Sequence, residues 1–403
     1  MKRKCLDKRS LASASKFVII SVLAVFLLGF AARRAAPQTN RPVSGDWDRE
    51  GAAKYLDDRM DIWFANAKKL QTGQSETSCV SCHTTVPYVM ARPVLRAAMR
   101  VNTATPQELR LIEETSRRVG SYETKRPLYD HNESKQAESR GTEAVLNALI
   151  LASADAAQDR REPSAATQQA FKQLWETQRS DGAWDWLDFG LEPFETVDAA
   201  YFGATLAALA VGAAPGPSIS LAAETKTGVK KLREYLKETY AAQSLFNRTW
   251  LLLASTRLND LLTSAQRIAL ITEIQSKQRD DGGWALESLG AWRWSKKAAP
   301  FRAPGTPDAA SLAKSDGYGT GLVVYALKLA GLPVGHPSVS KGLQWLRANQ
   351  QAVQVSQHTW MAWRAHSLNF DREHGGDKGE PWRRMFMSDS ATAFAVLALV
   401  SSN

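Results

Sequence analysis

Apolar residues recur with the helical period of about 3.6 through most of the chain after residue 50, and turns rich in Gly, Pro and Asp separate the helical stretches. Segments 163–178 and 264–278 are typical, since each has one apolar and one polar face. No run alternates apolar and polar residues with the period of two typical of a strand. The pattern predicts an all-α protein. Its stretches pair into six hairpins, at approximately 54–100, 107–153, 163–212, 225–258, 264–331 and 337–401.

A second kind of helical stretch is rich in Ala, Gly and Leu and begins near an acidic residue. These acidic residues are Glu138, Asp198, Asp316 and Asp389. A carboxylate at a helix start can accept hydrogen bonds from free N–H groups and complements the helix dipole. Small side chains let helices approach closely, as an inner layer requires. We therefore expect an inner ring of these helices, covered by the amphipathic ones, in one domain at 51–403.

A short motif repeats between the helices. Gln178–Trp184 reads QRSDGAW, and Gln278–Trp284 reads QRDDGGW with identical spacing one hundred residues later. A looser copy is KGLQWLRANQ at Lys341–Gln350, with Trp360 further on. Two copies with the same spacing indicate an internally repeated architecture.

This Q-x-x-x-G-x-W pattern resembles the QW repeat of squalene-hopene cyclases, in the terpenoid-cyclase and protein-prenyltransferase superfamily. The resemblance covers most of residues 54–401 and implies an (α/α) toroid of about six hairpins. It implies that the Gln and Trp residues are structural clamps between helix pairs, and that the ring's centre holds a hydrophobic or isoprenoid ligand. The clamp residues are Gln178, Trp184, Gln278 and Trp284.

The chemistry of that superfamily is not carried over with its pattern. No D-x-D-D segment, the proton donor of the cyclases, is present. Glu195 and Asp198 lie at an inner-helix start with i, i+3 spacing, so we expect both carboxylates on one helix face, where repulsion could raise one pKa. They are the catalytic candidates if the chain is a cyclase. Helix capping is the alternative. Prenyltransferases spread their zinc ligands over several helices, whereas here Cys and His cluster in one motif.

That motif is Cys79-Val80-Ser81-Cys82-His83, the C-x-x-C-H attachment signature of c-type haem. We expect the two thiols to lie one helical turn apart on one face, where they can add to the haem vinyl groups. His83 would then bind the iron. Two alternatives remain open: a disulfide between the cysteines, and a zinc site of Cys79, Cys82 and His83.

The second axial ligand is less marked in the sequence. Met90 follows His83 by seven residues, and His131 precedes an inner helix. These are the two candidates for the distal ligand. An open sixth position is the alternative, and it would favour ligand binding or peroxide chemistry over electron transfer.

The net charge of +10 suggests nucleic-acid binding only until its distribution is considered. Residues 1–34 hold eight Lys or Arg and one Asp, so about +3 remains for the rest of the chain, without a basic stripe. Nucleic acid is therefore excluded as a partner.

Residues 1–34 also resemble a targeting segment. Within them, sixteen apolar or small residues at Phe17–Ala32 follow a basic start, as in a signal anchor. Residues 35–50 read as a linker.

From these patterns we expect a single-pass protein of the inner membrane, with its main domain in the periplasm. The leading interpretation is a membrane-anchored c-type haem protein on a terpenoid-cyclase-like toroid. It would serve electron transfer with a periplasmic redox partner, or oxidation of a ligand in the central cavity. One alternative is a squalene-hopene cyclase-like or prenyltransferase-like enzyme acting on an isoprenoid. Another is a non-catalytic binding scaffold.

Overall fold

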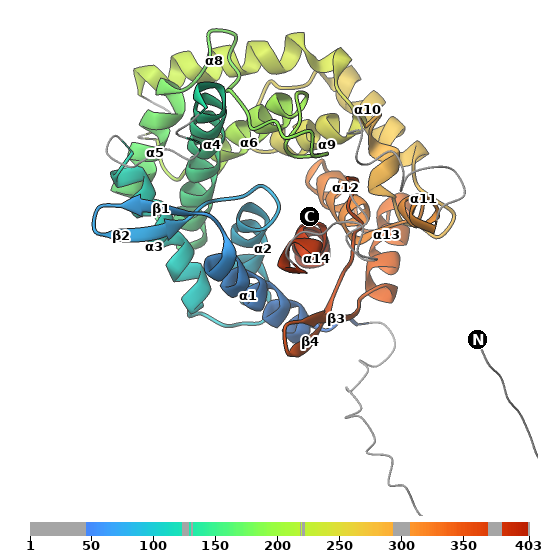
Figure 1. Cartoon of the computed structure of the whole chain (residues 1–403). Helices are drawn as coiled ribbons and strands as arrows, with labels where there is room; N and C mark the ends of the chain where they lie inside the picture. The colour runs from blue at the N-terminus through green and yellow to red at the C-terminus, as the bar shows by residue number, and fades with distance from the viewer. Residues whose placement is uncertain are drawn as a thin grey trace, which may run out of the picture. The chain divides into compact units, whose positions relative to one another are not determined.

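The computed structural model describes residues 46–122, 129, 132–217, 219, 222–292, 307–369 and 381–401. Helices dominate these ranges, which confirms the predicted all-α class (Figure 1). Each of the six predicted hairpins corresponds to a pair of helices. The pairs are α1 (Arg49–Asn66) with α2 (Thr85–Ala98), α3 (Pro106–Gly120) with α4 (Glu133–Ala157), α5 (Ala165–Glu176) with α6 (Ala199–Ala213), α8 (Ala223–Glu238) with α9 (Leu245–Ala254), α10 (Ser264–Ser276) with α12 (Gly317–Leu329), and α13 (Pro337–Ala348) with α14 (Phe386–Val400).

The second helix of each pair belongs to an inner set. Helix α2 contacts α4, and the contacts continue from α4 to α6, α9, α12 and α14 in turn. Helix α14 contacts α2, so the series of contacts is closed (Figure 1). Helices α6, α12 and α14 are buried over most of their circumference, as their low content of charged residues requires, and α4 is buried in the same way from Gly141 to Ala152. The first helices of the pairs pack outside them.

Shorter elements fill the turns. The structure has a six-residue helix α11 (Pro307–Leu312) and three 3-10 turns at Tyr240–Ala242, Leu286–Leu289 and Pro381–Met385. Two β-hairpins were not predicted: β1 (Lys69–Thr72) pairs with β2 (Ser75–Ser78), and β3 (Gln351–Val355) pairs with β4 (His358–Ala362), both antiparallel. Gly73 turns the first hairpin with a φ of 64°.

The repeated Gln and Trp residues join neighbouring helix pairs. Gln178 Nε2 donates to the carbonyls of Gly182 and Gly228, both at 3.0 Å, and so ties its own turn to α8. Gln278 Nε2 does the same with Gly282 at 2.8 Å and Ser338 at 2.9 Å, on α13. The Trp184 indole donates to Leu174 O and the Trp284 indole to Ile274 O, each closing the end of the preceding helix.

The third copy of this motif was only partly identified. Its Gln is Gln350, which accepts from Asp48 N at 2.7 Å and donates to Asp48 O at 2.8 Å, at the start of α1. Its Trp is Trp363, whose indole donates to Leu346 O at 2.8 Å. Trp360 was the wrong choice, since its indole donates to Asp58 instead. The β3–β4 hairpin lies between Gln350 and Trp363 and lengthens the motif.

The acidic residues at inner-helix starts do not share one role. Only Asp316 caps its helix, by accepting from the N–H groups of Tyr318 and Gly319. Asp198 precedes α6 without a side-chain capping bond. Glu138 lies within α4 and pairs with Lys135, and Asp389 lies in the first turn of α14 and pairs with Arg59. The general capping prediction is therefore wrong for three of the four.

The N-terminal predictions require correction. Among the described helices, none is both long and apolar enough to cross a bilayer, which contradicts the predicted single-pass placement in an inner membrane. The predicted anchor at 1–34 and the first part of the linker lie outside the described residues. The linker was also drawn too long, because Trp47 is buried and α1 begins at Arg49.

Candidate functional site

The C-x-x-C-H segment joins β2 to α2 and is not helical. Ser81 and Thr85 hold its turn together: Ser81 N donates to Thr85 Oγ1 at 2.8 Å, and Ser81 Oγ accepts from the N–H groups of Thr84 and Thr85. The Trp63 indole fixes the other end by donating to Cys79 O at 2.7 Å. This turn, rather than a helical turn, presents the motif.

The two thiols face different surroundings. Cys79 lies near the charged side chains of Lys68, Arg118 and Glu143. Cys82 lies deeper, near Glu195 and Tyr318. The prediction that both thiols share one helical face is therefore wrong.

Both cysteines are reduced in the structure. Burial raises the pKa of each thiol, and raises that of Cys82 well above its usual range. Reactive redox cysteines are instead partly exposed and have lowered pKa values. The raised pKa of both thiols and the burial of Cys82 therefore disfavour a redox-active disulfide.

His83 is enclosed by aromatic rings. Phe386 stacks on its imidazole with 3.9 Å between ring centroids and an interplanar angle of 18°. The Trp63 ring meets it edge-on at 5.3 Å. On the other side of the imidazole, Nδ1 lies 2.9 Å from Thr84 Oγ1. The ring is thus held in one orientation by stacking and by a hydrogen bond.

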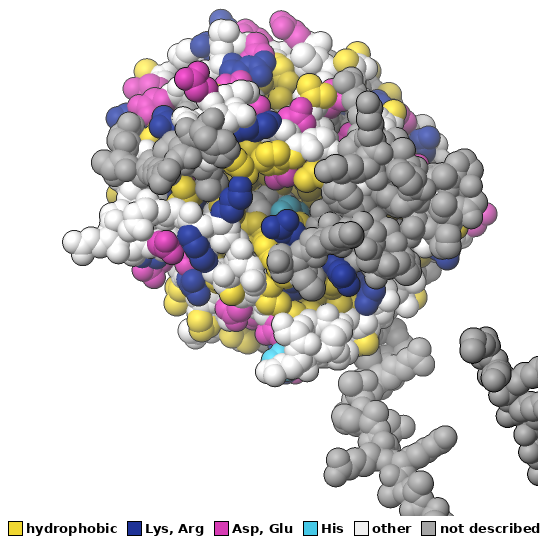
Figure 2. All heavy atoms as spheres, in the orientation of Figure 1, with side chains coloured by type: hydrophobic (Ala, Val, Ile, Leu, Met, Phe, Trp, Pro, Cys, Tyr) yellow, Lys and Arg dark blue, Asp and Glu magenta, His cyan; other side chains and the backbone are white. Residues whose placement is uncertain are grey.

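A small cavity of about 70 Å³ borders His83. Figure 2 shows a hollow near the middle of the face that it draws, with hydrophobic and basic side chains around it. The cavity is below the roughly 300–1,000 Å³ typical of ligand pockets. Besides His83, its lining includes three side chains that can bind a metal, namely Glu192, Glu195 and Met387.

Beneath His83 lies a buried ion pair between α1 and α14. Arg59 Nε donates to Asp389 Oδ1 at 2.7 Å, and both side chains are 3% exposed. Thr84 Oγ1 donates to the other carboxylate oxygen at 2.8 Å. The sequence analysis did not identify Thr84, and it assigned Asp389 only to the start of an inner helix. The adjacency of Thr84 to the motif was the only available signal.

The structure separates the two predicted cyclase carboxylates. Glu195 borders the His83 cavity, where it exchanges backbone hydrogen bonds with Leu191 in a short β-bridge. Asp198 is exposed just before α6. The expected i, i+3 pair on one helix face is therefore wrong, because the helix starts only after both residues.

Aromatic side chains pack the centre of the inner helix set. Their rings contact one another with centroids 5.0–6.5 Å apart, and none of these residues is more than 1% exposed. They are Phe202, Phe246, Trp250, Tyr318 and Phe394. Within the part of the chain that the structure describes, these side chains occupy the place where the cyclase resemblance implies a substrate chamber.

Of the two predicted distal ligands, the structure places only Met90, and it does not line the His83 cavity. Met90 lines a separate cavity of about 230 Å³ with Leu149, Leu209 and Leu253. His131 lies outside the described residues. Met387, which the sequence analysis did not consider, does line the His83 cavity.

Within the described ranges, no three His, Cys, Asp or Glu side chains converge on a position that could hold a metal ion. This finding counts against the zinc alternative of Cys79, Cys82 and His83. It does not test haem attachment, because the iron of a c-type haem takes only the imidazole from the motif.

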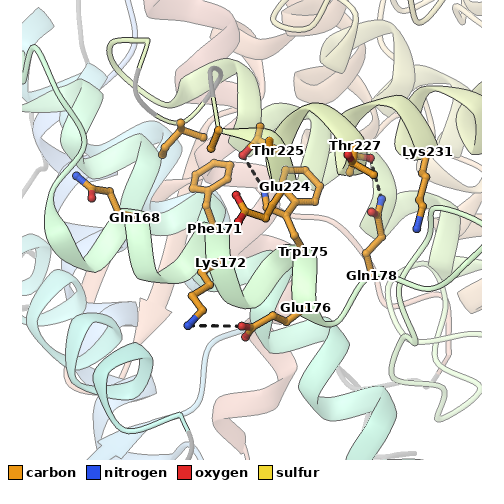
Figure 3. Close-up of a pocket in the computed structure, with 14 residues that line it drawn as sticks. Gln168, Phe171, Lys172, Trp175, Glu176, Gln178, Glu224, Thr225, Thr227 and Lys231 are labelled. Atoms are coloured by element: carbon orange, nitrogen blue, oxygen red, sulfur yellow. Dashed lines mark hydrogen bonds and ion pairs between the residues drawn. The ribbon is translucent and has the colours of Figure 1, made fainter.

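A larger groove of about 720 Å³ lies on the outer face between α5 and α8 (Figure 3). Its floor is Trp175, whose indole donates to Thr225 Oγ1 at 2.9 Å. A Cβ on Gly228 would lie 2.2 Å from the Trp175 ring, so α8 approaches closely. Gln178 at the groove's edge is a clamp residue. The groove is therefore the seam between two helix pairs.

The sequence matches no model of a known protein family, and no curated protein matches it. The chemistry of the His83 site is therefore the basis for function.

Proposed function

We propose that the chain is a c-type haem protein built on an (α/α) toroid of the terpenoid-cyclase type. The toroid is supported by the closed circle of contacts among the inner helices and by the Gln–Trp clamps. The haem is supported by the C-x-x-C-H motif with two reduced thiols. The observation that carries the proposal is the imidazole of His83, oriented by Thr84 at the edge of the cavity.

The residue types of the motif match those that hold this cofactor. Cys79 and Cys82 face different surroundings, however, and the cavity of about 70 Å³ beside His83 is below ligand-pocket size, so the site must open to take up haem. Cys79 and Cys82 each offer a thiol that can add across a vinyl group, and His83 offers an imidazole nitrogen for iron. The aromatic rings of Trp63 and Phe386 supply an apolar shell, which tunes the redox potential of such a site. Met387 lines the same cavity, and its thioether would be the second protein group to hold the iron.

When bound, haem supplies a one-electron redox centre. Around it, the chain's residues favour electron transfer over oxidation of a bulky ligand. The aromatic packing leaves the ring's centre filled, and the cavity beside His83 is small. Arg383 and Arg384 line the same cavity and are exposed, so we propose an acidic surface on the redox partner.

The same packing supports the haem protein over the isoprenoid-processing alternatives. Those enzymes need a chamber large enough for a polyprenyl chain and a proton donor or a zinc ion within it. Here Glu195 borders the small His83 cavity, and Asp198 is exposed.

Pyridine haemochrome spectroscopy tests the proposal. The full chain is produced with an export system and a cytochrome c assembly system, then denatured. We expect about one covalently bound haem per chain, lost in the Cys79→Ser, Cys82→Ser double variant. Cys5→Ser, which removes the third cysteine, is the matched control and should retain the haem. Wild-type chain without covalent haem after this maturation would overturn the proposal.

A further inference from the structure

The Asp389 carboxylate is saturated with donors. Its Oδ1 accepts from Tyr55 Oη at 3.0 Å and from Arg59 Nε at 2.7 Å. Its Oδ2 accepts from Arg59 Nη2 at 3.0 Å and from Thr84 Oγ1 at 2.8 Å. A carboxylate offers about four lone-pair sites, and all of them are used. Because Asp389 is 2% exposed, the arrangement is shielded from water.

The position of the Thr84 proton follows from this geometry. The hydroxyl has one hydrogen, and the ionised Asp389 can only accept, so Thr84 donates that hydrogen to Asp389. Its oxygen can then only accept from His83 Nδ1, which lies 2.9 Å away. His83 Nδ1 must therefore carry a proton. In the neutral imidazole the lone pair is consequently on Nε2.

We propose that Thr84 and Asp389 are positioning residues that fix His83 in the Nδ1–H tautomer and so keep its lone pair on Nε2. Arg59 and Tyr55 act one step further out, since they hold Asp389 in place. Ser390, which follows Asp389 on α14, fixes the backbone of His83 by donating to its carbonyl at 3.0 Å. Asp389 on α14 thus acts on the ligand nitrogen of His83 through Thr84, which is 305 positions away along the chain.

The consequence is a metal-binding nitrogen that is preset before any cofactor arrives. An imidazole that donates its second N–H toward a carboxylate is also more basic as a ligand. The effect on a bound iron rests on the proposed function. The tautomer itself does not, because it is argued from the contacts of Thr84 and Asp389.

Nitrogen NMR distinguishes the two tautomers directly. The full chain is labelled with ¹⁵N-histidine, produced without haem-attachment machinery, and measured at about pH 8, where an ordinary histidine is neutral. The chain has six histidines, and the imidazole signal that disappears in His83→Gln is assigned to His83. We expect an Nδ1–H imidazole in the wild type and in Thr84→Ser, which keeps the hydroxyl. Thr84→Val and Asp389→Asn should show a population shift toward Nε2–H.

Two results would overturn this inference: an Nε2–H imidazole in the wild type, or an unchanged spectrum in Thr84→Val. Thr84→Val leaves the buried Arg59–Asp389 ion pair intact, so this variant still tests the inference if Asp389→Asn fails to fold. In haem-loaded protein, Asp389→Asn should raise the midpoint potential, and Thr84→Ser should not. Failure of haem attachment appears in the haemochrome spectrum and leaves the tautomer measurement intact.

Discussion

Asp316 is a fully enclosed carboxylate at the start of α12. It accepts from the N–H groups of Leu286 at 2.5 Å, Tyr318 at 2.9 Å and Gly319 at 2.8 Å. Burial nevertheless dominates over these bonds and raises the pKa of Asp316 to about 6. The folded protein therefore binds this proton more tightly than the unfolded chain, in which an ordinary Asp has a pKa of about 3.9.

This difference predicts a pH dependence of stability. The contribution of Asp316 is fully present below about pH 4 and is lost as pH rises through about 6, amounting to roughly 3 kcal/mol. In denaturant unfolding, the free energy of unfolding of the wild type should fall relative to that of Asp316→Asn as the pH rises from 4 to 7. Asp260→Asn, which removes an exposed charge, is the control. A wild-type advantage that grows toward pH 7 would contradict the prediction.

At the residue scale, the sequence identified a contiguous motif but not its distant partners. Cys79, Cys82 and His83 are neighbours in the chain, and their spacing alone indicates haem attachment. Asp389 joins them only because α14 closes against α2. Its acidic character was read as helix capping, since the sequence holds no sign that Arg59 faces it. Glu195 and Asp198 were misread because the start of α6 could not be placed within four residues.

At the scale of helices and turns, the Gln–Trp turns link neighbouring helix pairs. Each turn needs a residue with positive φ, which Gly182 and Gly282 supply at 95° and 89°. A Cβ on Gly182 would also lie 2.3 Å from Lys231 O on α8. Gly thus permits the close approach that the neighbouring Gln then fastens with its amide.

Removing one clamp should weaken the fold measurably. Gln278→Ala deletes two hydrogen bonds, to Gly282 O and Ser338 O, and should lower the free energy of unfolding by about 1–3 kcal/mol. Gln344→Ala on α13 removes an exposed amide with one long contact of 3.4 Å and should change it by less than about 0.5 kcal/mol. Equal effects in chemical denaturation would show that the clamp is not a stabilising element.

The helix pairs were predictable because outer helices such as α3 and α5 are amphipathic, whereas inner helices such as α6 are long stretches rich in Ala, Gly and Leu. The β-hairpins were not, because strands of four or five residues such as Lys69–Thr72 give too short a pattern. The third Gln–Trp copy failed for a related reason: the inserted β3–β4 hairpin separates Gln350 from Trp363 and breaks the fixed spacing. Trp360 was chosen only because it comes first along the chain.

In the molecule as a whole, the first and last helix pairs meet at one seam. Gln350 bridges to the backbone of Asp48, and the Arg59–Asp389 ion pair joins α1 to α14 deeper inside. Trp47 packs against Trp363 with ring centroids 5.6 Å apart. The seam therefore uses the same Gln–Trp chemistry as the internal junctions, with residues from opposite ends of the described chain.

If each junction opens as a local unit, hydrogen exchange should locate the damage. Gln350→Ala removes the bonds to Asp48 and should speed amide exchange in α1 and the β3–β4 hairpin, with little change in α5 and α8. Gln178→Ala, which loosens the α5–α8 junction, is the matched control and should give the reverse pattern. A uniform acceleration in both variants would mean that the closed circle of helices unfolds only as one cooperative body, with no independent seam.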